Sequence, residues 1–112
     1  MRIISFTKMW DKLKQPEFTT FRFPRKDKDW QEGETIQVFC RNRSPNREKL
    51  GEALIVGKES KITGRPETDI TDEEAIADGF TDARDMEQWL IQTYGIRRVA
   101  QESMNKLTLR WI

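Results

Sequence analysis

Histidine is absent from this sequence of 112 residues, and cysteine occurs once, at Cys40. The lack of histidine excludes a Cys-His or Ser-His catalytic pair, and together with the single cysteine it excludes a zinc site. One cysteine forms no internal disulfide, and its place in the apolar run TIQVFC favours a buried structural thiol over a nucleophile. Carboxylates that hold Mg²⁺ stay open as an alternative, but the sequence predicts no cofactor.

Long apolar runs are also missing, since no stretch reaches the roughly 18 apolar residues of a membrane-spanning helix. The N-terminal stretch MRIISFTKMW holds only a short apolar segment and no small-residue cleavage site, so no signal peptide is expected. We find no internal repeat, no low-complexity tract and no long linker. The sequence therefore predicts a single soluble domain over residues 1–112, cytoplasmic and monomeric, with no membrane association.

The net charge of +1 conceals a strong asymmetry along the chain. Residues 1–62 hold 14 Lys and Arg against 9 Asp and Glu, a net charge of +5. Residues 63–90 hold 2 against 9, a net −7, and residues 91–112 hold 4 against 1, a net +3. An anionic ligand is therefore compatible with the near-neutral total, provided that the basic residues gather on one face.

Hydrophobic periodicity predicts strands at both ends of the chain and helices in its middle. Residues 17–23, EFTTFRF, alternate as a half-buried strand does, and Gly51 and Gly57 suggest a bulge or bend in a long strand. A short helix over residues 8–15 would end before Pro16, because the residue that precedes a proline is disfavoured in a helix. The predicted strands are residues 2–7, 17–23, 35–41, 50–62 and 105–112.

Two helices are predicted in the acidic middle, over residues 71–78 and 82–94. Thr71 followed by Glu74 forms a capping box for the first helix, and Gly79 supplies its stop. One apolar stripe on the second helix, typical of a core-facing side, consists of Met86, Trp89, Leu90 and Tyr94. The whole pattern predicts an α+β fold, in which a small mixed sheet curls into a barrel and helices pack on it.

Three motifs, taken in order, resemble the ASCH domain (activating signal cointegrator homology), a member of the PUA-like superfamily. The first is the strand IISFT, which leads through a short helix to a strand that ends Thr20-Phe21-Arg22. The second is WQEGETIQVF, similar to the family's Gly-[Asp/Glu] turn that feeds a barrel strand. The third is ITDEEAIADGF followed by MEQWLIQTYG, similar to the family's acidic helix, Asp-Gly-Phe turn and aromatic-bearing second helix. The match covers nearly the whole chain.

The resemblance implies a PUA-like pseudo-barrel of about five to six mostly antiparallel strands with two to three flanking helices. It also implies a cleft between barrel and helices, where relatives bind RNA or modified bases, and a role in RNA metabolism or translation. One branch of similar length hydrolyses the acetyl amide of N4-acetylcytidine with a Lys, a Thr and a carboxylate. Its Thr-x-Arg matches Thr20 and Arg22, and its carboxylate falls on Asp78. Glu17 stands where its lysine is expected, and the nearest amine is that of Lys14.

Thr20 and Arg22 stand two residues apart on a predicted strand, so their side chains share the face opposite Phe21. That face either meets solvent or lies in the cleft, where Arg22 would form charge-assisted hydrogen bonds to a phosphate or a base edge. The other candidate nucleic-acid-binding residues are Arg25, Lys26, Trp30, Arg41, Arg43 and Arg47. Their cations would contact phosphates, and the rings of Trp10 and Trp30 would stack on unpaired bases, although solvated loops explain the same charges.

Two functions are therefore expected as alternatives. The first is an RNA-binding module that takes an unstacked base in the cleft, with RNA or a modified nucleoside as its partner. The second is a small hydrolase, either an N4-acetylcytidine amidohydrolase or a ribonuclease, and the missing lysine counts against the amidohydrolase. In the hydrolase, Thr20 would be the nucleophile or a substrate donor and Asp78 the base. Lys14 or Arg22 would then give electrostatic support, and a protein partner for the acidic helix is a third alternative.

Overall fold

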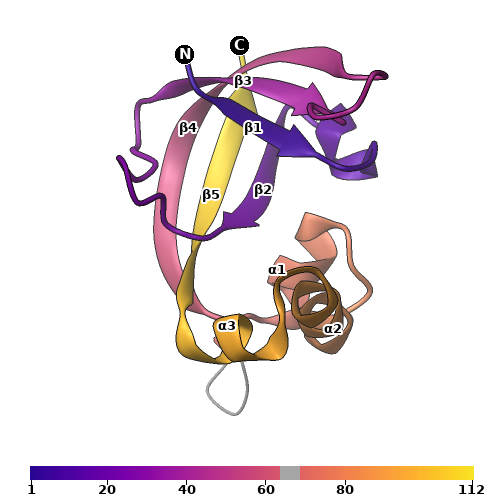
Figure 1. Cartoon of the computed structure of the whole chain (residues 1–112), viewed down its shortest axis with the longest axis vertical. Coiled ribbons are helices and arrows are strands. Elements are labelled where there is room, and N and C mark those ends of the chain that lie inside the picture. The colour runs from indigo at the N-terminus through magenta and orange to yellow at the C-terminus, as the bar shows by residue number, and fades with distance from the viewer. Residues whose placement is uncertain (64–68) are drawn as a thin grey trace.

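The computed structural model describes residues 1–63 and 69–112 (Figure 1). Its elements, in chain order, are β1 (Ile3–Phe6), the 3-10 helix η1 (Asp11–Lys14), β2 (Glu17–Arg22), β3 (Thr35–Cys40), β4 (Glu48–Ile62), α1 (Asp72–Asp78), α2 (Ala83–Tyr94), α3 (Ile96–Gln101) and β5 (Ser103–Trp111). The predicted α+β class is confirmed, because strands form both ends of the chain and α-helices separate β4 from β5.

The five strands form one sheet in the order β1-β3-β4-β5-β2, so that β1 and β2 are its two edges. β1 runs parallel to β3, and the other neighbouring pairs are antiparallel. The register shifts between Val38 and Phe39 and between Ile55 and Gly57, and such bulges bend and twist a strand. The sheet accordingly curls into a half-barrel, as Figure 1 shows, and the expected barrel-like sheet with flanking helices is confirmed.

Two hydrophobic clusters lie on the two faces of this sheet. Side chains from all five strands fill the barrel, where Phe18 of β2 packs with Phe6 of β1. Phe21 has the opposite orientation to Phe18 and packs against the helices, as the alternation of a strand requires. The cluster between sheet and helices consists of Phe21, Ile70, Ala75, Met86, Leu90, Val99 and Met104. It holds the three helices against one end of the half-barrel (Figure 1).

Caps set the boundaries of α1 and α2, and the structure confirms the predicted capping box and glycine stop of α1. Thr71 Oγ1 accepts a hydrogen bond from the backbone N–H of Glu74 at 3.1 Å, and the Glu74 carboxylate accepts one from the Thr71 N–H at 3.1 Å. Gly79 ends α1 with a φ of +112°, and Asp82 Oδ1 accepts the N–H of Asp85 at 2.8 Å to begin α2. None of the helices in the described ranges is long and apolar enough to cross a membrane.

Four elements differ from the sequence prediction, namely η1, α3, β4 and β5. The expected helix over residues 8–15 is reduced to the four residues of η1, because Met9 is 47% exposed and Leu13 is the residue that η1 buries. Helix α3 was not predicted, since Val99 is its one buried side chain and a single apolar anchor gives no periodicity. Strands β4 and β5 each begin two residues earlier than expected, at Glu48 and Ser103.

Candidate functional site

A cavity of about 300 Å³ lies where the open side of the half-barrel meets the helices. Strands β1 and β2 and the segment around η1 form one wall, and α1 and α2 form the other. The polar side chains that line it are Ser5, Thr7, Lys12, Thr20, Arg22, Asp78 and Thr93. The structure thus brings together three predicted site residues from β2 and α1, namely Thr20, Arg22 and Asp78.

Arg22 spans the gap between the two edge strands. Its Nη2 donates a hydrogen bond to the carbonyl oxygen of Ser5 on β1 at 2.9 Å, and its Nε donates to Thr20 Oγ1 at 3.1 Å. Burial lowers the pKa of the Arg22 guanidinium, while Tyr94 and Asp78 act in the opposite direction. Arginine remains charged under such conditions, so the cavity contains a fixed cation whose Nη1 has no partner among the described residues.

Lys12 and Asp78 form a buried ion pair in the same cavity. Lys12 Nζ lies 2.7 Å from Asp78 Oδ1, and the two side chains are only 7% and 8% exposed. Burial lowers the pKa of Lys12 and raises the pKa of Asp78, whereas the attraction between the two groups opposes both changes. Arg22 contributes in the same sense as Lys12 to the pKa of Asp78, which it lowers. Two cations therefore share one carboxylate, and the site carries a net positive charge.

Aromatic rings form much of the remaining wall. Trp10, Phe80 and Trp89 contact one another, with ring centroids 5.2 Å apart for Trp10 and Phe80, 5.6 Å for Phe80 and Trp89, and 6.0 Å for Trp10 and Trp89. Tyr94 also lines the cavity and packs edge-on against Phe23 at 5.0 Å. Gly79 makes this cluster possible, because a Cβ there would lie 2.7 Å from the Trp10 ring. Rings of this kind offer flat apolar surfaces to a planar ligand.

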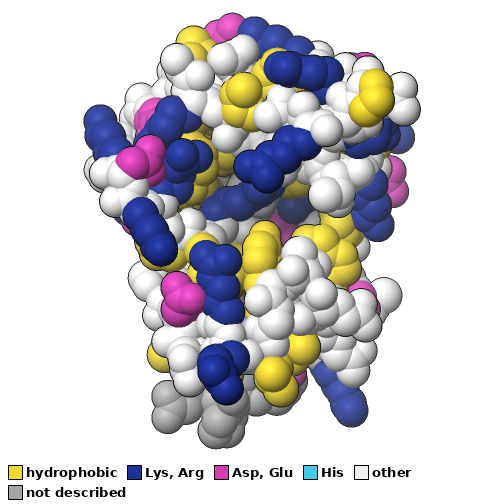
Figure 2. Space-filling view, in the orientation of Figure 1, with side chains coloured by type: hydrophobic (Ala, Val, Ile, Leu, Met, Phe, Trp, Pro, Cys, Tyr) yellow, Lys and Arg dark blue, Asp and Glu magenta, His cyan; other side chains and the backbone are white. Residues whose placement is uncertain are grey.

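A wider groove of about 860 Å³ opens beside the cavity. The groove and the cavity share Ser5, Phe6, Thr7 and Arg22 as common walls. No carboxylate of the described residues lines the groove, whereas its arginines are Arg2, Arg22, Arg25, Arg41 and Arg43. Figure 2 shows Lys and Arg side chains gathered around a hollow in the middle of this face. Arg22 and Arg43, which lie far apart in the sequence, therefore face the same space.

Two other predicted contacts, Arg25 and Trp30, also line the groove but are engaged with other side chains, whereas Lys26 lies outside it. Arg25 lines the groove but pairs with Asp27, with 3.1 Å between Nε and Oδ1. Trp30 is only 4% exposed and packs in the barrel core, where the Arg2 guanidinium lies 4.5 Å from its ring centroid. The ring is thus covered rather than presented for stacking. Lys26 is exposed and lines neither the cavity nor the groove.

The amine of the cavity belongs to Lys12 and not to Lys14. Lys14 is 74% exposed and lies 3.7 Å from Asp11, away from Thr20. With four residues, η1 is too short for periodicity to show which lysine points inward, so the sequence offered no signal for Lys12. Arg47 also lies outside the groove lining, and its guanidinium is 4.6 Å from the centroid of the Phe39 ring.

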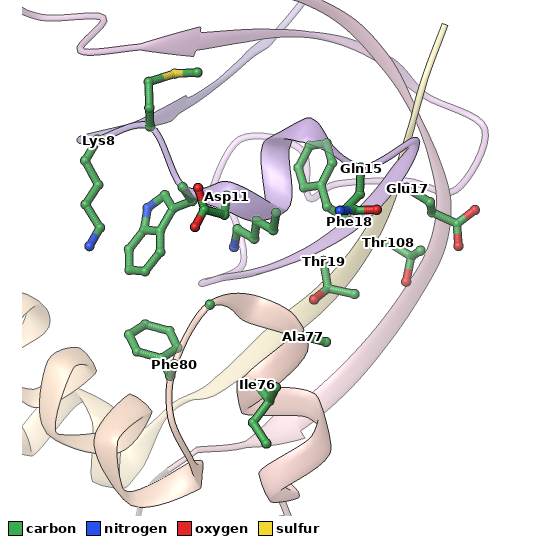
Figure 3. A pocket seen from close by; sticks show the side chains of 14 residues that line it. Lys8, Asp11, Gln15, Glu17, Phe18, Thr19, Ile76, Ala77, Phe80 and Thr108 are labelled. Atoms are coloured by element: carbon green, nitrogen blue, oxygen red, sulfur yellow. The ribbon is translucent and has the colours of Figure 1, made fainter.

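A third hollow, of about 690 Å³, lies between η1, α1 and the outer face of β2 and β5. Figure 3 shows Thr19 and Thr108 on the sheet between Asp11 and Gln15 on one side and Ile76 on the other. Glu17 belongs to this hollow and binds Arg110 at 3.1 Å, so it does not form a carboxylate pair with Asp78. Carboxylates and amines alternate around the hollow, which offers no charge of one sign to a ligand.

No family model, curated protein or solved structure matches this chain. Within residues 1–63 and 69–112, no group of three or more Cys, Asp or Glu side chains is arranged to hold a metal ion. The cavity and the groove are therefore the features that indicate a function.

Proposed function

We propose that this protein is an RNA-binding module of the ASCH type, acting in RNA metabolism or translation, whose cavity holds one unstacked base. The observation that carries the proposal is the cavity of about 300 Å³, which combines aromatic walls with hydrogen-bonding groups of both kinds. Sequence-specific RNA-binding proteins commonly place unstacked bases against aromatic rings and bind the base edges through hydrogen bonds. This cavity supplies both contacts in one place.

The polar groups suit the edge of a nucleobase. Lys12 and the free Nη1 of Arg22 are donors, and Asp78 is an acceptor. The hydroxyl of Thr20 accepts a hydrogen bond from Arg22, and its own hydrogen remains available to a ligand. Base edges present donors and acceptors side by side, whereas a hydrocarbon ligand would leave the remaining donors, Nη1 of Arg22 and the Thr20 hydroxyl, without partners.

A substitution on α2 tests whether the cavity is the binding site. Thr93 lines the cavity from an exposed position, so Thr93→Phe places a ring in the space with little cost to the fold. Gln92→Phe adds the same ring at the neighbouring exposed position, which does not line the cavity, and is the matched control. Stacking of one base on an aromatic side chain is worth about 1–3 kcal/mol, so Thr93→Phe should weaken binding of short single-stranded RNA about tenfold.

The measurement is an NMR titration of the isotope-labelled protein with short single-stranded and hairpin RNAs at low and moderate salt. In the wild-type protein, chemical-shift changes should cluster at residues 5–7, 20–22 and 86–94. They should saturate at a lower RNA concentration than in the Thr93→Phe variant. Equal affinities of the Thr93→Phe and Gln92→Phe variants would refute binding in the cavity. The absence of shifts with every RNA would refute RNA binding altogether.

The buried Lys12–Asp78 pair favours a second candidate function, a small hydrolase that acts on an acylated nucleoside or on RNA. In support of this candidate, Lys12 lines the same cavity as Thr20, although it is a different lysine from Lys14. In this function the Thr20 hydroxyl is the nucleophile or a substrate donor, Asp78 accepts a proton, and Lys12 and Arg22 stabilise the developing oxyanion.

Turnover of N4-acetylcytidine and of single-stranded RNA by the purified folded protein tests this second candidate. Thr20→Val and Lys12→Met should each abolish turnover, while Lys14→Met removes an exposed amine close in sequence and should leave it unchanged. Folding of each variant is checked by circular dichroism. No turnover by the wild-type protein with either substrate would remove the hydrolase and leave the binding function.

A further inference from the structure

The groove beside the cavity contains cations that no described carboxylate neutralises. Arg41 and Arg43 line the groove, and neither forms an ion pair with a described residue. Arg2 and Arg25 line it too, but each is held by a carboxylate outside the groove lining. Two exposed guanidinium groups are therefore available to a ligand, and Asn42 and Ser44 lie between and beside them as neutral hydrogen-bonding groups.

The turn that carries these arginines is fixed to the wall of the cavity. Arg41 has a φ of +54°, a conformation that few non-glycine residues adopt. Its backbone N–H donates to the carbonyl oxygen of Phe6 at 2.7 Å, and the N–H of Asn42 donates to Ser5 Oγ at 3.2 Å. Ser5 and Phe6 line both the cavity and the groove, so the turn is positioned directly on the partition between the two. Strained backbone held in this way is common where a ligand is bound.

A ligand that fills both spaces must have a flat polar ring joined to an anion. The cavity offers aromatic walls and a base-edge hydrogen-bonding pattern, and the groove offers guanidinium groups with no competing carboxylate among the described residues. Arg22 lines both spaces and has one amino group of its guanidinium unused. Guanidinium groups bind phosphate oxygens with short, charge-assisted and often bidentate hydrogen bonds.

We propose that the turn at residues 41–44 is a phosphate subsite of the base cavity, formed by Arg41 and Arg43. The ligand class is then a phosphorylated nucleotide, as a unit of a single strand, and not a free nucleoside. This inference rests on the proposed function, because it places the phosphate next to the base that the cavity holds. The inference also predicts which basic residues contribute to affinity for the phosphate. Arg41 and Arg43 do, whereas Lys26 and Arg47 lie outside the groove lining and do not.

The test compares ribonucleosides with their 3′- and 5′-monophosphates by isothermal titration calorimetry on the wild-type chain. Hydrogen bonds to charged groups contribute about 1.5–3 kcal/mol, so at least one monophosphate should bind about tenfold more tightly than its nucleoside at low salt. The double variant Arg41→Gln/Arg43→Gln should lose this gain and keep the affinity for the nucleoside. Arg84→Gln/Arg97→Gln removes the same charge from exposed positions on α2 and α3 and should keep the gain.

The outcomes separate this inference from the proposed function. If nucleosides bind and a phosphate adds nothing, or if Arg84→Gln/Arg97→Gln removes the gain equally, the phosphate subsite is refuted and the base cavity stands. If monophosphates bind in the groove but Thr93→Phe has no effect on them, the base cavity is refuted. Arg43→Gln alone repeats the test with one exposed side chain, so the result does not depend on how Arg41→Gln affects the turn.

Discussion

The Lys12–Asp78 pair determines both the stability and the chemistry of the cavity at the scale of single residues. Its two side chains are 7% and 8% exposed, so each charge depends on the other for compensation. Removal of one partner from a buried pair leaves an uncompensated charge, which costs roughly 3–5 kcal/mol of folding stability. Replacement of both by apolar groups costs far less.

We predict that Lys12→Met lowers the free energy of unfolding by about 3 kcal/mol, whereas Lys12→Met/Asp78→Leu lowers it much less. Urea denaturation of the wild type, both single variants and the double variant completes the cycle. Equal losses for Lys12→Met and the double variant would show that the two charges do not stabilise each other.

Gly79 is a position where both the backbone conformation and the neighbouring Trp10 ring exclude a side chain, so its substitution should lower the stability of the fold. Its φ is +112°, and a Cβ would lie 2.7 Å from the Trp10 ring. Gly33 is the matched control, since its φ is +86° and nothing lies within 4 Å of its Cβ position. We expect Gly33→Ala to lose about 1 kcal/mol of stability from backbone strain alone, and Gly79→Ala to lose at least about 2 kcal/mol. Gly79→Ala should also change the tryptophan fluorescence, because the new methyl group displaces the Trp10 ring. If thermal unfolding showed stability losses of the same size for Gly33→Ala and Gly79→Ala, the close packing of Trp10 on Gly79 would not matter for stability.

At the scale of elements, Glu74 connects α1 to the sheet. Its carboxylate lies 2.7 Å from Lys106 Nζ of β5 and 3.3 Å from Lys61 Nζ of β4, and it also accepts the N–H of Thr71. Burial alone would raise the pKa of Glu74, but the hydrogen bonds from Lys106, Thr71 and Lys61 lower it to about 2. The ionised carboxylate therefore fixes α1, and with it Asp78, beside β2.

This network predicts a specific dependence of stability on pH. The pKa of Glu74 in the folded state, about 2, lies below its ordinary value of 4.5, so its ionisation stabilises the fold above pH 4.5. That contribution is lost as the pH falls from 4.5 through about 2. Glu74→Gln keeps the capping box, so it should reduce the loss of stability over this range, measured by denaturation at several pH values. Glu73→Gln, an exposed neighbour, should leave the profile unchanged, and identical profiles for both variants would contradict the role of Glu74.

The elements also show how far the sequence predicts this structure. Alternation over residues 17–23 correctly placed Thr20 and Arg22 on one face of β2. Side chains of a strand alternate between its two faces, so Thr20 and Arg22 must lie on the same face as the buried Phe18. The capping box of α1 was predicted because it consists of local hydrogen bonds. Lys12 was missed because its position depends on its contact with Asp78 of α1, which is 66 residues away along the chain. Tertiary contacts of this kind have no local signature.

The whole molecule explains the uneven charge along the sequence. Carboxylates of the acidic middle neutralise lysines of the N- and C-terminal parts: Asp78 binds Lys12, and Glu74 binds Lys61 and Lys106. These pairs hold α1 against the half-barrel. No carboxylate of the described residues lines the groove beside its arginines. A chain with a net charge of only +1 therefore presents a positive surface next to an aromatic cavity. Net charge alone did not reveal this arrangement.

In the proposed function, an unstacked base enters the cavity between the half-barrel and the helices. The most direct measurement is a set of intermolecular NOEs between the base protons of a bound short single-stranded RNA and the isotope-labelled protein. We predict NOEs to the ring protons of Trp89 and Tyr94 and to the methyl group of Thr93, all of which line the cavity. NOEs confined to exposed residues outside the cavity, with none to these three side chains, would refute base binding in the cavity.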